Sequence, residues 1–215
     1  MNIVVDNFDA YVGGMVDTIV LTLLSFALAF VVGTVVAGFR VSPVPPLRAA
    51  GTAYVNIVRN TPLAVLMVLF WFGLLPNLGF RFSRFWAGIF VLTAYTGTFV
   101  AEAVRAGINS VAVGQAEAGR SLGLTFPATL GQVIMPQAMR TVVQPLGSIF
   151  IALIKNSALV TIISVPNLTK AGEDIGTKSA DLFGSIVGVG LAYLVLTLPA
   201  GAAVGWIERR VAFRR

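Results

Sequence analysis

Long runs of apolar residues without charge dominate the sequence. Four runs are each close to the roughly 20 residues that a helix needs to cross the hydrocarbon of a bilayer, at 18–39, 62–80, 85–101 and 182–207. In a fifth region, residues 141–154 and 156–169 are uncharged and Lys155 stands between them. We therefore predict five helical spans, the fourth of them long or broken, at about 14–39, 60–80, 85–106, 141–165 and 182–207.

The composition agrees with a membrane protein. Hydrophobic residues make up 57% of the 215 residues and charged residues only 11%, against about 25% charged residues in soluble domains. Strands of a membrane barrel would alternate apolar and polar residues in segments of about ten, which these runs do not. The chain is predicted to be an all-α integral membrane protein with one transmembrane domain, residues 1–215. Its first apolar run lacks a basic leading region, so we expect it to remain as a span.

The sequence contains no cysteine and no histidine. Disulfides, thiolate nucleophiles and the commonest metal ligand and general base are therefore excluded, and we expect no catalytic residue, metal site or cofactor in this chain. A Lys155 and Ser157 dyad would be an enzyme candidate, but residues two apart point to different faces of a helix. The basic residues are spread along the loops without aromatic neighbours, so nucleic acid is not an expected partner.

Basic residues are divided unequally between the two sides that five spans create. One side carries ten arginines, at positions 40, 48, 59, 105, 120, 140, 209, 210, 214 and 215. The other side carries Arg81, Arg84, Lys170 and Lys178 together with Asp6, Asp9, Glu173, Asp174 and Asp181. The excess of basic residues in cytoplasmic loops predicts an N-terminus outside and a C-terminus in the cytoplasm.

The longest hydrophilic segment, residues 102–140, lies on the predicted cytoplasmic side. Gly114 precedes a helix-forming stretch, and Gly123 stands where a helix C-cap is expected. Thr125 is a candidate N-cap, and Pro127 suits the first turn of a second helix. We predict two short helices at an angle to each other, outside the bilayer, within about residues 112–136.

The same segment resembles the coupling-loop pattern of bacterial ABC importer permeases, E-A-A-x-x-x-G-x9-I-x-L-P. The matching residues keep its spacing and are Glu117, Ala118, Gly119, Gly123, Val133, Met135 and Pro136. Glycine replaces the second alanine, valine the isoleucine and methionine the leucine. Because the change from alanine to glycine costs about 1 kcal/mol of helix propensity, we expect a looser first helix.

Further stretches are similar to the polar amino acid subfamily of these permeases along almost the whole chain. They are RNTP at 59–62, AY at 94–95, AE at 101–102, RAGI at 105–108, GQ-x-E at 114–117, SLG at 121–123 and KNSAL at 155–159. The subfamily commonly has a second hydroxyl residue where Ala158 stands, so a hydrogen-bonding role at that position is not carried over. The resemblance also implies five spans with the N-terminus outside.

The resemblance implies a permease subunit of an ATP-driven importer that moves a polar amino acid across the bacterial inner (plasma) membrane by alternating access. The implied partners are a dimer of separate ATPase subunits, which bind ATP and magnesium, a second identical or different permease, and an extracytoplasmic amino-acid-binding protein. Glu117, Ala118, Gly119, Gly123 and Pro136 would form the contact with the ATPase. In that contact Gly123 would make the turn, Pro136 would end the second helix, and Glu117 would cap or form a salt bridge.

A few polar residues within or next to the spans are candidates for the substrate path. Lys155 lies about 21 Å along a helix that begins near Thr141, and with Asn156 and Ser157 it either lines the passage or anchors an external gate. Thr61 is a further candidate, interpreted first as the N-cap of a helix whose first residue is Pro62. Glu102 and Arg105 are three apart and are predicted to form a structural ion pair.

An ion-coupled secondary transporter or channel subunit is the alternative function. Such coupling usually needs carboxylates inside the membrane or broken helices in two halves, and Glu102 is the only acid near the interior of a predicted span. As the candidate cation of the path, Lys155 favours glutamate, aspartate or glutamine over arginine or lysine. The same lysine would equally suit the α-carboxylate of any amino acid.

Overall fold

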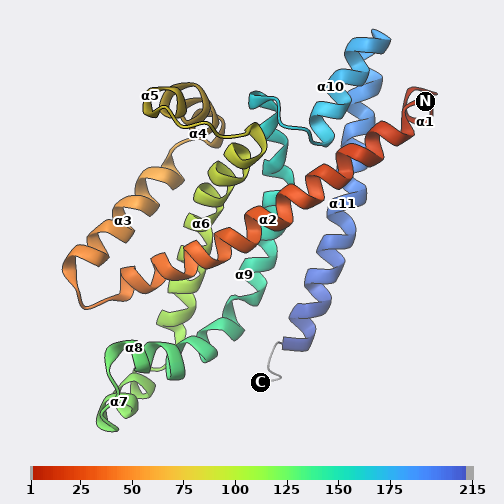
Figure 1. Cartoon of the computed structure of the whole chain (residues 1–215). Helices are drawn as coiled ribbons and strands as arrows, with labels where there is room; N and C mark the ends of the chain where they lie inside the picture. The colour runs from red at the N-terminus through yellow and green to blue at the C-terminus, as the bar shows by residue number, and fades with distance from the viewer. Residues whose placement is uncertain (1, 212–215) are drawn as a thin grey trace.

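The computed structural model describes residues 2–211, and these residues form helices joined by short turns, without a strand (Figure 1). The α-helices are α1 (Asn2–Asp6), α2 (Phe8–Val41), α3 (Pro45–Asn60), α4 (Leu63–Val68), α5 (Leu75–Leu78), α6 (Arg84–Ser110), α7 (Val113–Ser121), α8 (Phe126–Ala128), α9 (Met135–Asn156), α10 (Leu168–Ser179) and α11 (Leu182–Val211). Two π-helical segments, η1 (Leu69–Leu74) and η2 (Thr129–Ile134), and one 3-10 segment, η3 (Ser157–Ile163), interrupt them. The predicted all-α fold is confirmed.

Helix α2 runs obliquely across the other long helices (Figure 1). Its 34 residues correspond to about 51 Å, far more than the roughly 30 Å of bilayer hydrocarbon, so α2 has to tilt in a membrane. Four helical stretches are long and apolar enough to span: Phe8–Val41, Arg84–Ser110, Phe126–Ile163 and Leu182–Arg210. A bent pair of helices brings the number to as many as five.

The bent pair occupies the region of the expected second span, 60–80, and differs from that expectation. Pro45–Asn60 and Leu63–Leu78 meet at 105°, and Thr61 between them is extended at ψ 129, as residues before a proline prefer. The stretch before residue 60, expected to be a loop, is helix α3. Arginines and other polar residues interrupt the apolar positions of α3, so a search for apolar runs does not find this helix. Pro62, directly before Leu63, causes the break between the two helices.

The interpretation of Thr61 as a helix N-cap was wrong. Pro62 occupies the N-cap position of α4, and Thr61 ends α3 instead. The Thr61 hydroxyl donates a hydrogen bond of 2.8 Å backward to the carbonyl oxygen of Ile57. Its side chain therefore stabilises the end of one helix rather than the start of the next.

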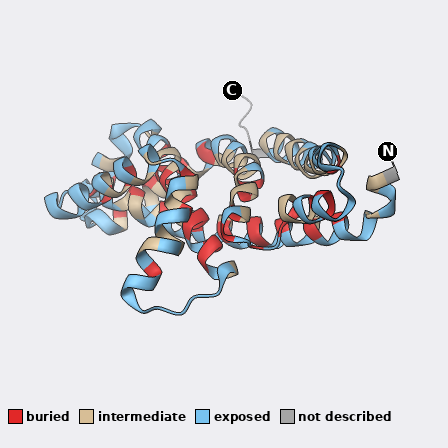
Figure 2. Cartoon of the chain, turned by 90° about the horizontal axis from the view of Figure 1, so that it is seen from above, coloured by how far each residue is buried: buried red, intermediate tan, exposed pale blue. Residues whose placement is uncertain are grey.

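Helices α2 and α6 pack closely through small residues. Gly33 of α2 is buried, and a Cβ at that position would lie 2.6 Å from Cβ of Val100 and 2.7 Å from the carbonyl oxygen of Gly97. Only glycine permits this approach of two helix backbones. Buried residues gather where the long helices touch, while outward turns are exposed (Figure 2), and many of those exposed residues are large and apolar, such as Val31 and Leu198.

The chain turns sharply after α9 through a buried polar junction. Asn167 is 1% exposed; its side-chain oxygen accepts hydrogen bonds from the Lys170 N–H at 2.7 Å and the Thr161 hydroxyl at 2.9 Å. Its amide donates to the carbonyl oxygen of Ser157 at 2.9 Å. Asn167 is thus the N-cap of α10 and joins it to η3.

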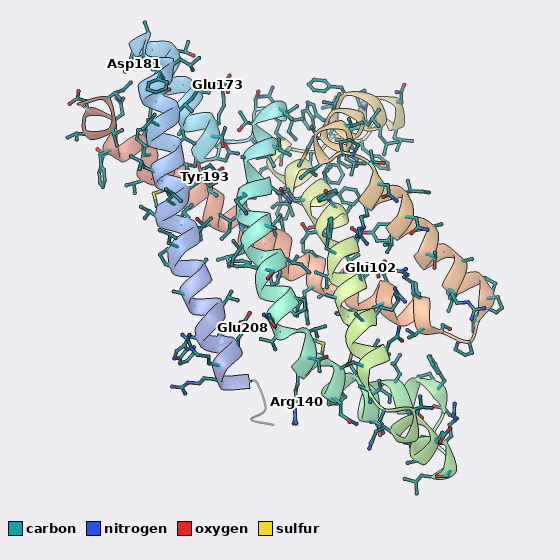
Figure 3. All side chains as sticks on the ribbon, turned by 180° about the vertical axis from the view of Figure 1, so that it is seen from behind. Glu102, Arg140, Glu173, Asp181, Tyr193 and Glu208 are labelled. Atoms are coloured by element: carbon teal, nitrogen blue, oxygen red, sulfur yellow. The ribbon has the colours of Figure 1, made fainter. Side chains whose placement is uncertain are left out.

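The two ends of the bundle differ in their charges. Helices α1 and α10 lie at one end, and α7, α8 and the end of α11 lie at the other (Figure 1). Glu173 and Asp181 lie at the first end, and Arg140 lies toward the second (Figure 3). At the first end, the Lys170 ammonium group lies 2.8 Å from the Asp174 carboxylate, and this contact raises the pKa of Lys170.

Candidate coupling segment and transport face

The turn after α7 is built as the sequence predicted for Gly123. This residue has φ +81, in the left-handed region that glycine tolerates. Its N–H donates to the carbonyl oxygen of Arg120 at 2.9 Å, and the N–H of Leu124 donates to that of Gly119 at 3.1 Å. These two bonds are those of a Schellman motif, with glycine directly after the C-cap, Leu122. The chain therefore reverses within a few residues.

The second arm of the segment is not a separate short helix. Residues Phe126–Ile163 form one continuous helical stretch, and Pro136 lies at its interior, one residue into α9. The prediction that Pro136 ends the second helix was therefore wrong. Just before it, the N–H of Met135 bonds to the carbonyl oxygen of Leu130 in the wider π geometry of η2, and this local widening accommodates a residue without an N–H.

Thr125 precedes this second arm without capping it through its side chain. Pro127 lies in the first turn as expected, and the backbone N–H of Thr129 bonds to the Thr125 carbonyl oxygen at 2.8 Å. Thr125 is extended at ψ 163. The helix start therefore depends on backbone geometry and proline rather than on a hydroxyl cap.

Gly119 packs α7 against η2. Gly119 is buried, and a Cβ there would lie 3.0 Å from Cγ2 of Thr129. The glycine that replaces the second alanine of the pattern thus brings the two arms of the segment together. Outside this contact, Glu117 is exposed and has no hydrogen bond or ion pair within residues 2–211, and Leu122 is 81% exposed. The tip therefore presents an unpaired carboxylate beside apolar surface.

An ion cluster around Glu102 ties three helices together between the two ends of the bundle (Figure 3). Arg105 lies 3.0 Å from its carboxylate, which is the pair that the spacing predicted. Arg40 of α2 lies 2.8 Å from the same carboxylate and Arg59 of α3 lies 3.8 Å away. Arg59 also stacks over the ring of Phe99, at 5.6 Å. Sequence spacing gave no signal for the contacts of Arg40 and Arg59, because these residues are distant along the chain.

Lys155, Asn156 and Ser157 do not share one face. Lys155 is exposed and has no ion pair within residues 2–211. Asn156 lines a cavity of about 230 Å³ between α6 and α9, together with Tyr95 and Ser148. Ser157 is fully buried and its hydroxyl donates to the carbonyl oxygen of Ile154 at 2.6 Å, so it does not line an aqueous passage here.

Within residues 2–211, no group of three acidic residues could hold a metal ion.

Comparison with known proteins gives the family. The sequence profile described as binding-protein-dependent transport system inner membrane component matches residues 11–213. The chain belongs to this family. It is therefore a permease, a transport subunit that lies in the inner membrane with several spans.

Individual relatives cover nearly the whole permease. The probable glutamine ABC transporter permease protein GlnM of Bacillus subtilis is 40% identical over 211 residues, covering 98% of this chain and 97% of that protein. The glutamate transport system permease protein GluC of Corynebacterium glutamicum is 41% identical, covering 92% of each. A crystal structure of an amino acid ABC transporter with histidines matches with a TM-score of 0.87 at 32% identity, covering 96% of each chain.

These matches decide between the two functions that the sequence left open. GlnM is named as an ABC transporter permease and GluC as a transport system permease, and ABC importer permeases work with an ATPase and a substrate-binding protein in general. The permease interpretation is therefore supported over the ion-coupled secondary transporter.

Proposed function

We propose that this permease imports a polar amino acid by alternating access, driven by a dimer of separate ATPase subunits that dock on residues 112–136. The observation that carries the proposal is the protruding elbow of α7 and the second arm, closed by the Gly123 turn, with Glu117 unpaired at its surface. A rigid elbow that continues directly into α9 can pass movement of a soluble subunit to a helix in the membrane. Glu117 would meet a basic group of the ATPase.

The proposed assembly follows from the same arrangement. The end with α7 would face the cytoplasm, because Arg140 lies toward it (Figure 3) and the sequence assigns ten arginines to that side. The end with α1 and α10 would then face outward and receive the amino-acid-binding protein. A second permease, identical or different, would complete the passage, and ATP and magnesium would bind to the ATPase alone.

Glutamine, glutamate or aspartate is the proposed substrate class. Two relatives of about 40% identity are named for glutamine and glutamate. Lys155 is exposed, lacks an ion pair within the described chain, and directly precedes Asn156, which lines the cavity between α6 and α9. We place Lys155 and Asn156 beside the passage, with Thr61 at the bend of the α3 and α4 pair as an outlying candidate.

Reversal of charge at Glu117 tests the coupling segment. In proteoliposomes with the ATPase, partner permease and binding protein, Glu117→Arg should lower ATP-driven uptake and binding-protein-stimulated hydrolysis by about tenfold or more, because like charges would then meet at the docking contact. Glu208→Arg, the same change at the same end but on α11, should leave both rates near those of the unmodified protein (Figure 3). Uptake that persists without ATP on a proton or sodium gradient would contradict the importer function.

Lys155→Gln tests the proposed path. We expect the KM for glutamate uptake to rise about tenfold, the size of a lost hydrogen bond to a charged group, whereas Arg48→Gln, at an exposed arginine of α3, should leave it unchanged. An equal rise for glutamine would assign Lys155 to the α-carboxylate, and a rise for glutamate alone would assign it to the side chain. Unchanged KM values for both substrates would remove Lys155 from the path.

A further inference from the structure

A groove of about 540 Å³ lies on the inner side of α7, where the coupling segment meets the ends of two long helices. Val41 at the end of α2 and Ile108 near the end of α6 form one wall, and Leu130 and Ile134 of the second arm form another. Most of this lining is aliphatic. The groove is therefore an apolar cleft at the ends of α2 and α6, two of the candidate spans.

The residues of α7 that line the groove lie on a different face of the helix from Ala118, the alanine that follows Glu117 in the coupling pattern. Val113, Ala116 and Arg120 line the groove and follow one another at intervals of three and four, which places them on one face of α7. Ala118 is two positions from both Ala116 and Arg120, so it points away from that face. A ligand in the groove and a protein docked on the outer face can be bound at the same time.

Two polar groups and one cation distinguish this groove from a simple apolar cleft. Thr129 lines it, is 6% exposed, and its hydroxyl has no hydrogen-bond partner among the described residues. That hydroxyl lies 3.3 Å from where a Cβ of Gly119 would be, next to Arg120 in the sequence. Asn109 is the second polar group, and no acidic residue of the described part of the chain lines the groove. Burial of a hydrogen-bond donor without a partner costs free energy unless a ligand or a water molecule accepts its hydrogen bond.

We propose that this groove binds one anionic phospholipid of the leaflet at the α7 end. The lipid phosphate would lie between Arg120 and the Thr129 hydroxyl, and an acyl chain would cover the wall of Ile108 and Ile134. Charge complementarity selects an anionic headgroup, since the lining holds a cation and no acid. Because the groove lies at the ends of α2 and α6, the acyl chains of a lipid bound in it would extend into the bilayer. Such a lipid would brace the coupling segment against the spans.

The test uses the whole importer complex after removal of lipid, titrated with phosphatidylglycerol or phosphatidylcholine and followed by native mass spectrometry. Arg120→Gln should weaken binding of one phosphatidylglycerol per permease about fivefold, the contribution of one basic residue near a lipid surface. Arg48→Gln, at an exposed arginine of α3 that does not line the groove, should have no effect. Ala116→Leu should fill the groove and remove that lipid, whereas Ala106→Leu on the exposed face of α6 should retain it.

The outcome does not depend on the transported substrate or on coupling to ATP. Equal affinity for the two lipids, or equal effects of Arg120→Gln and Arg48→Gln, would overturn the proposal. So would an Ala116→Leu variant that retains as many lipids as Ala106→Leu. Competition by inorganic phosphate alone would show a simple anion site and would likewise rule out the lipid.

Discussion

Glu102→Ala is expected to lower the free energy of unfolding of this permease by about 3 kcal/mol, the lower part of the range for breaking a buried ion pair. The substitution leaves Arg40, whose side chain is 9% exposed, without the carboxylate that lies 2.8 Å away. It also removes the partner of Arg105. The guanidinium of Arg40 would then remain charged and largely buried without compensation. Unfolding of the purified complex in detergent or nanodiscs measures this effect.

Two further variants isolate the cause. Glu173→Ala removes an exposed carboxylate that pairs with Lys170 at 3.3 Å, and because pairs at the surface contribute little, we expect a loss below about 1 kcal/mol. Arg40→Leu combined with Glu102→Leu removes both partners of the ion pair and should recover a large part of the loss. If Glu102→Ala and Glu173→Ala destabilise equally, the cluster does not join α2 to α6.

Gly33→Leu is expected to destabilise the chain by a similar amount, about 3 kcal/mol, at the upper end of the usual range for an overpacked core. A Cβ at this position already meets Val100 and the carbonyl oxygen of Gly97 at less than 3 Å. The backbone oxygen belongs to α6 and cannot rotate away as a side chain can. Accommodation of leucine therefore requires the two helices to separate, which exposes the other small residues of the crossing.

Gly38→Leu is the matched control for this prediction. Gly38 lies on the same helix, and apart from its immediate helix surroundings a Cβ there would have no atom of the described residues within 4 Å. Because leucine also favours helix more than glycine does, by about 0.8 kcal/mol, this variant should be neutral or slightly more stable. Thermal unfolding of both variants in the same lipid measures the difference. Equal stability of the two would show that α2 and α6 do not pack at Gly33 in the membrane.

Local features of the candidate site could be predicted from the sequence because neighbouring residues determine them. Gly123 makes the turn after α7 since a left-handed residue there satisfies the last carbonyl groups of that helix. Glu102 and Arg105 pair because residues three apart face each other on a helix. The apolar runs also predicted the all-α membrane class, since a helix satisfies its own backbone groups in lipid.

Other features depended on contacts between distant segments. Arg40 reaches Glu102 from 62 positions away in the sequence, and no local pattern indicates that meeting. Helix α3 is amphipathic and is stabilised by packing on α6, where the Tyr54 hydroxyl donates to the carbonyl oxygen of Ala94 at 2.6 Å. Apolar runs cannot predict such a helix, because its polar face breaks the run.

The course of the chain near Pro136 and Ser157 shows the same division. A proline is a local signal for a helix end, and a serine two positions after a lysine is a local signal for a polar passage. In the structure, the π turn of η2 carries the helix past Pro136. Ser157 is buried, its hydroxyl donates to the carbonyl oxygen of Ile154, and its own carbonyl oxygen accepts from the Asn167 amide. The sequence alone determined the class, the turn at Gly123 and the pair at Glu102, because these depend on neighbouring residues. Only the tertiary structure decided which helices continue and which polar side chains are buried, because that depends on distant segments that fill the same space.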